Sequence, residues 1–86
     1  MPMPAPAAPD VSEVLQPDGT VVNVYMKGDE WLNWVETTDG YTISRGKDGF
    51  WHYVIEYIGK TPVLDSVKAH ETAPDGRKKH LRPKRK

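Results

Sequence analysis

Pairs of an acidic residue and glycine recur along the chain and divide it into short segments. They include Asp-Gly at 18–19, 39–40 and 48–49, and Gly-Asp-Glu at 28–30. Asp-Gly supplies the positive backbone angles that tight hairpin turns require. Because a turn explains these carboxylates fully, we interpret Asp39 and Asp48 as turn residues, and we expect strands between the corners.

The segments between the corners alternate apolar and polar residues with a period of two. They are rich in valine, isoleucine, threonine and aromatic residues, which favour strands. The five segments are TVVNVYMK at 20–27, WLNWVET at 31–37, YTISR at 41–45, FWHYVIEYI at 50–58 and TPVLDSVKA at 61–69. They predict an all-β fold, a small antiparallel meander of about five short strands. Segment 50–58 is apolar on both faces, so we expect it to be the central strand.

The two ends of the chain differ from this middle in composition. Residues 1–13 are rich in proline and alanine, and such segments bury too little apolar surface to offset their ordering entropy. Residues 70–86 carry seven of the chain's twelve lysines and arginines. We therefore expect a disordered segment at 1–13, a β domain at 14–69, and a basic flexible tail or linker at 70–86.

Charge is distributed unevenly, although the chain is neutral overall. Residues 1–76 hold all twelve acidic residues and five basic ones, a net charge of −7, whereas residues 77–86 have a net charge of +7. A basic tail without interleaved aromatic residues makes weak, salt-sensitive contacts with polyanions, so we do not expect nucleic acid as a partner. No stretch approaches the roughly 20 apolar residues of a membrane span. We expect no membrane contact and a monomer when the chain is isolated.

Residues 70–80, HETAPDGRKKH, resemble the start of a zinc-protease helix. That signature needs a second histidine four residues after the first, on the same helical face. Pro74 occupies that position here, and proline breaks a helix. The chain also has no cysteine, which excludes thiolate zinc sites and a cysteine nucleophile. We expect no enzyme activity, no metal site and no cofactor.

The order of the motifs is more specific than any one of them. Gln-Pro-Asp-Gly at 16–19, Gly-Asp-Glu at 28–30, Glu-Thr-Thr-Asp-Gly-Tyr at 36–41 and Trp-His-Tyr at 51–53 follow one another. This order resembles the N-terminal propeptide region of secreted zinc metalloproteases of the immune inhibitor A type. The resemblance implies a non-catalytic propeptide that assists folding of its protease and masks the active site until it is removed. It also implies that the partner is the cognate metalloprotease catalytic domain, in cis, and that the location is secreted or cell envelope, with the signal peptide not present in this chain.

Two groups of residues are candidates for partner contact and for processing. We expect the partner's cleft to contact the stretch that leads out of the β domain, residues 70–75, which we call the exit segment, and exposed aromatic side chains. The candidate contacts are His70, Glu71, Asp75, Trp31 and Trp34. An exposed polybasic segment is a ready cleavage site, so the expected processing residues are Arg77, Lys78, Lys79, Arg82, Lys84 and Arg85. Because a chain without cysteine places no thiolate on zinc, we expect masking by surface burial. The alternative is a stand-alone small β binding module that uses its aromatic residues or its basic tail to bind a protein or polymer.

Overall fold

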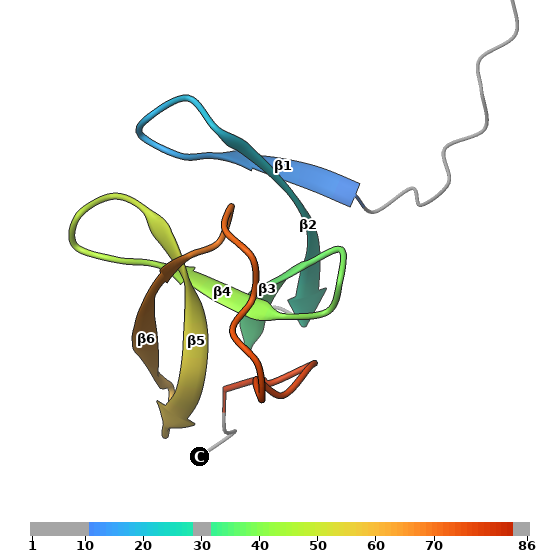
Figure 1. Ribbon diagram of the computed structural model, residues 1–86. Coiled ribbons are helices and arrows are strands. Elements are labelled where there is room, and N and C mark those ends of the chain that lie inside the picture. Colours follow the sequence, from blue (N-terminus) through green and yellow to red (C-terminus); the bar gives the residue numbers. More distant parts are fainter. Residues whose placement is uncertain (1–10, 29–31, 84–86) are drawn as a thin grey trace, which may run out of the picture.

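The computed structural model describes residues 11–28 and 32–83. These residues form one antiparallel sheet of six strands, arranged in sequence order, and contain no helix (Figure 1). The strands are β1 (Val11–Leu15), β2 (Val21–Gly28), β3 (Asn33–Thr37), β4 (Thr42–Arg45), β5 (Trp51–Ile58) and β6 (Thr61–Lys68). The predicted all-β meander is confirmed, with six strands where about five were expected.

The additional strand is β1, which begins at Val11, inside the segment expected to be disordered at 1–13. All five of its residues pair with β2, from Val11 opposite Tyr25 to Leu15 opposite Val21. This pairing buries Val14 against Val22. The strand is therefore stabilised by its pairing with β2 and not by an apolar–polar alternation of its own. Residues 1–10, the rest of the expected segment, lie outside the described residues.

The core lies on one face of the curled sheet. In an antiparallel pair, residues directly opposite each other point to the same side, and the register sets Val24 opposite Thr37 and Ile43 opposite Tyr53. The buried cluster consists of Val14, Val22, Val24, Ile43, Tyr53 and Ala69, with Val35, Tyr41, Trp51, Val67 and Ala73 packed against it. The aromatic rings thus take part in the core, as a domain of this size requires.

Strand β5 is the fifth of the six strands and not the central one expected from its sequence. It buries three consecutive residues, His52, Tyr53 and Val54. Register shifts against β6 lie between His52 and Val54 and between Val54 and Glu56. Such irregularities re-aim neighbouring side chains, so the apolar residues on both faces reflect bulges rather than a central position.

Residues 69–83, which we call the C-terminal strap, run back across the sheet after β6 (orange to red in Figure 1). Four backbone groups fix their course. The Ala69 amide donates to the Trp51 carbonyl at 2.8 Å and the His80 amide to the Gly40 carbonyl at 2.7 Å. The Tyr53 hydroxyl lies 2.6 Å from the Glu71 carbonyl, and the Thr42 hydroxyl donates to the Leu81 carbonyl.

The strap places residues 70–83 on the β domain, where a flexible tail or linker was expected. The reason is that its anchors are backbone carbonyls and amides together with Ala69 and Pro83, both of which are buried. The expectation of a flexible tail rested on charged side chains, and these do not indicate where backbone groups, Ala69 and Pro83 are bound. Residues 84–86 lie outside the described residues.

Candidate functional site

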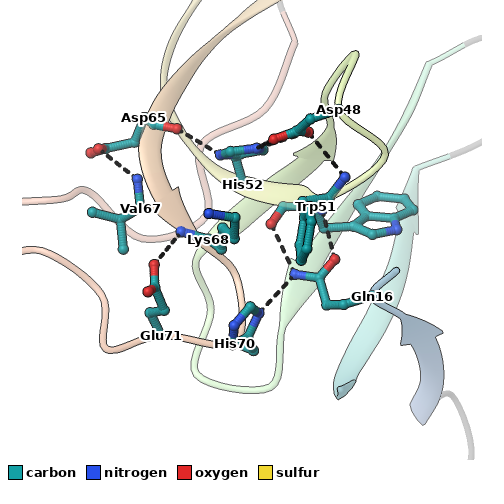
Figure 2. A network of polar contacts seen from close by, with 10 residues as sticks. Gln16, Asp48, Trp51, His52, Asp65, Val67, Lys68, His70 and Glu71 are labelled. Atoms are coloured by element: carbon teal, nitrogen blue, oxygen red, sulfur yellow. Dashed lines mark hydrogen bonds and ion pairs between the residues drawn. The ribbon is translucent and has the colours of Figure 1, made fainter. Parts of the chain in front are cut away.

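Gln16, the first residue of the motif order, is buried and joins three parts of the chain (Figure 2). Its Oε1 accepts from the Trp51 amide at 2.8 Å, and its Nε2 donates to the Trp51 carbonyl and to Nδ1 of His70, each at 3.1 Å. Because both hydrogens of the Gln16 amide are used as donors, Nδ1 of His70 is an acceptor and the His70 proton is on Nε2. The His70 ring also lies 6.2 Å from that of Phe50.

Glu71 and Asp75, the other candidates from the exit segment, have different surroundings. The Glu71 Oε1 accepts from the Lys68 amide at 2.8 Å and so closes the turn that follows β6. Burial, with the nearby charge of Asp39 adding to it, raises the pKa of the Tyr53 hydroxyl that bonds the Glu71 carbonyl. Asp75 is exposed. His70 and Glu71 are therefore largely engaged in shaping the strap.

His52 of β5 is the centre of a second polar group, with Asp48 and Asp65 (Figure 2). Its Nδ1 lies 2.9 Å from the Asp65 carbonyl oxygen, and its Nε2 lies within hydrogen-bond distance of the Asp48 carboxylate, at 3.0 Å. This hydrogen bond, together with the Phe50 amide, holds the pKa of the Asp48 carboxyl below its ordinary value. The group contains no serine, threonine or cysteine placed as a nucleophile, and it links the β4–β5 turn to β6.

Glu36, in the Glu-Thr-Thr-Asp-Gly-Tyr motif, is 1% exposed. Its Oε2 accepts from Nε1 of Trp34 at 2.8 Å, and its Oε1 accepts from Nδ1 of His80 at 2.9 Å. The neighbouring Gly40 has φ 97° and its Cα faces the His80 ring, where an added Cβ would lie 3.1 Å from a ring carbon. The β3–β4 hairpin thus holds His80 of the strap through Glu36 and Gly40.

The expected processing residues differ in accessibility. Arg77 donates from Nε and Nη2 to the Asp65 carboxylate, and this contact holds the pKa of the Asp65 carboxyl below its ordinary value. The Lys79 ammonium lies 5.5 Å from the centre of the Tyr41 ring. Lys78 and Arg82 are exposed. Lys84 and Arg85 lie outside the described residues.

Two of the hollows on the described residues each take in candidates from the sequence. The first, of about 340 Å³, lies between β2, the β3–β4 turn and the strap. It is polar, and its lining includes Thr20, Asn23, Thr38, Asp39, His70 and Glu71. It brings His70 and Glu71 together with turn residues, while Asp75 does not line it.

The second hollow, of about 290 Å³, is formed by β3, β4, β5 and the β5–β6 turn, with Pro83 of the strap at its border. We call it the aromatic hollow. It is lined by Asn33, Trp34, Val35, Ile43, Ser44, Arg45, Trp51, Tyr57, Lys60, Pro62 and Pro83. Trp34 is the only candidate contact residue among them, and Trp31, the other candidate tryptophan, lies outside the described residues.

Within residues 11–28 and 32–83, no group of three or more histidine, aspartate or glutamate side chains is arranged to hold a metal ion. In the same ranges, no helix is long and apolar enough to cross a bilayer. The polar side chains that the fold brings together connect one part of the chain to another. What they do chemically is to fix the strap and the turns.

Comparison with known proteins gave no relative. No protein-family model matches the chain, no curated protein matches it, and no solved structure matches it. The residue resemblance described above therefore remains an expectation.

Sequence reasoning missed the two buried polar residues Gln16 and Glu36, and it missed His80 as a partner of Glu36. A signal for the first two was present. Both belong to the motif order, but neither occupies a turn position that calls for its side chain. A conspicuous polar residue that no turn explains is a candidate for a buried hydrogen-bond role.

Proposed function

We propose that this chain is a non-catalytic propeptide module of a secreted zinc metalloprotease of the immune inhibitor A type. In this role it assists folding of the protease and masks the active site until it is removed. The partner is the cognate catalytic domain, in cis, and the location is secreted or cell envelope.

The observation that supports the proposal is that residues of the motif order form hydrogen bonds with the strap. Gln16 and Trp51 are bonded to each other and, through Gln16, to His70 of the strap. Glu36 is bonded to His80, further along the strap. The residues on which the resemblance rests therefore hold the segment that leads out of the domain, which is what a module attached to a following enzyme needs.

Masking by surface burial fits this arrangement better than direct coordination of zinc. Nδ1 of His70 is occupied by Gln16, and Oε1 of Glu71 is occupied by the Lys68 amide. To coordinate zinc through these atoms, His70 or Glu71 would have to break the hydrogen bond that it makes in the strap. Affinity would then come from the buried contact surface and would need no single zinc ligand.

The proposal is tested by adding the folded chain in trans to a mature protease of this type and measuring peptide hydrolysis. We expect inhibition, and we expect His70→Ala, Glu71→Ala and Asp75→Ala each to weaken it by less than about tenfold, or ~1.4 kcal/mol. Circular dichroism confirms that each variant is folded. A folded chain that does not inhibit at about 100 μM would contradict the proposal, and a thousandfold loss in one folded variant would replace burial by zinc ligation.

A stand-alone binding module is the second candidate. The observation that favours it is the aromatic hollow, where three large rings and two basic side chains meet at the surface. The two functions predict different results in trans, because a stand-alone module has no reason to inhibit a metalloprotease.

A further inference from the structure

The aromatic hollow is apolar in its lining and open to solvent. Three large rings, those of Trp34, Trp51 and Tyr57, face it together with Val35, Ile43, Pro62 and Pro83. A volume of about 290 Å³ is at the lower end of what ligand sites offer, and such sites pair an apolar lining with a few placed polar groups. The space suits one large side chain and its neighbours and is too small for a whole cofactor.

Two polar groups at the hollow are donors with no partner among the described residues. Nε1 of Trp34 is bonded to Glu36, but the indole nitrogen of Trp51 and the hydroxyl of Tyr57 have no partner within the described residues. Since every fully buried side-chain nitrogen or oxygen there has a partner, the Tyr57 hydroxyl must retain contact with solvent although the residue is only 7% exposed. Burial also raises the pKa of this hydroxyl, so it stays protonated at neutral pH.

The charges at the hollow are of one sign. Arg45 and Lys60 are exposed, and neither forms an ion pair with another described residue. No aspartate or glutamate occurs among the described residues that line it. This positive site belongs to a region, residues 1–76, whose net charge is −7. Charge complementarity steers oppositely charged partners to such a patch and rejects like-charged ones.

We propose that the aromatic hollow binds an extended acidic peptide segment in which a large apolar side chain stands next to carboxylates. The apolar side chain packs on the rings of Trp51 and Tyr57, and the carboxylates accept from Arg45 and Lys60. An extended peptide fits because the hollow is open to solvent, so a chain can run across it and place one side chain inside. The chain's own basic end is disfavoured as the occupant, because residues 84–86 are all cationic and would be repelled by the same two side chains.

This inference does not depend on the proposed function, because it concerns the hollow of the isolated chain and applies to a propeptide and to a stand-alone module alike. If the chain is a propeptide, the acidic segment belongs to the partner protease. If inhibition in trans fails while acidic peptides still bind, the proposed function fails and this inference stands.

The test uses the full chain and two capped peptides, Glu-Phe-Asp-Glu-Phe-Asp and its uncharged counterpart Gln-Phe-Asn-Gln-Phe-Asn. Binding is followed by tryptophan fluorescence and by backbone amide shifts in NMR spectra at low ionic strength. We expect the acidic peptide to bind at least about tenfold more tightly than the uncharged one, with shifts at Arg45, Trp51 and Tyr57, and with an affinity that falls as salt is added.

Single-charge variants decide whether the site is the hollow. Arg45→Ala and Lys60→Ala should each weaken binding of the acidic peptide by about three- to tenfold. Lys47→Ala is the matched control, since it removes the same charge from an exposed residue of the β4–β5 turn that does not line the hollow. Arg45, Lys47 and Lys60 are all exposed, so folding should be unaffected.

Three results would overturn the inference. Equal affinity for the two peptides would remove the role of the carboxylates. An equal loss in the Lys47→Ala variant would indicate general charge attraction. Binding of phenylacetate as tight as that of the acidic peptide would indicate a small-molecule site instead of a peptide site.

Discussion

Two histidines of the strap are held by buried polar residues of the motif order, and they are held in opposite ways. His70 accepts from the Gln16 amide at Nδ1, whereas His80 donates from Nδ1 to the Glu36 carboxylate. Both Gln16 and Glu36 are 1% exposed. The difference between the two contacts is that a proton on Nδ1 is excluded at the first site and required at the second.

The two contacts also hold different parts of the molecule. Gln16 also satisfies the amide and carbonyl of Trp51, so the contact at His70 is tied to the joining of the β1–β2 turn to β5 (Figure 2). Glu36 satisfies only side chains, those of Trp34 and His80. The first contact is therefore part of the sheet, and the second is chiefly an anchor for the strap.

The largest effect is expected from Gln16→Ala. It leaves the backbone N–H of Trp51 without its partner and removes one of the two donors to the Trp51 carbonyl, which keeps the Ala69 amide. A buried unsatisfied polar group costs about 1–3 kcal/mol. We expect the free energy of unfolding in urea, followed by tryptophan fluorescence, to fall by about 3 kcal/mol. Asn23→Ala is the control, because it removes an exposed amide and should change stability by less than about 0.5 kcal/mol. A loss for Gln16→Ala no greater than that of the control would refute the role given to Gln16.

An intermediate effect is expected from Glu36→Ala. The substitution removes the acceptor of the Trp34 indole and of His80. We expect the free energy of unfolding in urea to fall by about 2 kcal/mol. Because Glu36 contacts the strap and not the backbone of the sheet, amide exchange should be accelerated more at His80 than in β2. The control is Glu56→Ala, at an exposed glutamate of β5. If exchange rose equally throughout the sheet, the separation drawn between the two contacts would be wrong.

The smallest effect is expected from Asp65→Asn, which weakens the contact of the strap with β6. The Arg77 hydrogen bond, followed by that of the Val67 amide, keeps the Asp65 pKa below its ordinary value of 3.8. A lowered pKa stabilises the fold above the unfolded value, and this stabilisation is lost as the pH falls through the folded value. We expect a loss of about 1 kcal/mol at pH 7 and a flatter fall in stability between about pH 5 and pH 2.

The pH dependence of unfolding, measured in urea for both proteins, checks this expectation. Asp75→Asn serves as the control because Asp75 is exposed. An Asp65→Asn protein with the same acid-induced loss as the unchanged chain would show that the Asp65–Arg77 contact does not contribute.

The sequence predicted the parts of the fold that local chemistry determines. The turns at Asp39-Gly40 and Asp48-Gly49 are present, with φ of 97° at Gly40 and 87° at Gly49, and alternation located five of the six strands. Strand β1 was missed because Val11–Leu15 has only a weak alternation, and its pairing with β2 supplies the rest.

The strap was missed for a different reason. Its long-range side-chain bonds to the sheet and its turns join residues from 12 positions apart, as in Asp65 with Arg77, to 54 positions apart, as in Gln16 with His70, and no local pattern encodes them. The seven basic residues of 70–86 predicted a solvated tail. The groups that hold the strap are instead backbone atoms, His70, His80, Arg77 and the buried Pro83. The candidate contacts His70 and Glu71 were found by position in the exit segment, and their structural partners were not foreseeable from that position.

Amide hydrogen exchange at His80 in the unmodified chain tests most directly whether the strap belongs to the fold. The His80 amide donates to the Gly40 carbonyl at 2.7 Å, so opening the strap is required before it exchanges. We expect exchange at neutral pH to be slowed at least about 100-fold relative to an unstructured peptide, with Ala69 protected as well. Exchange of His80 at the unstructured rate, while the amides of β2 remain protected, would contradict the account and return residues 70–83 to a flexible tail.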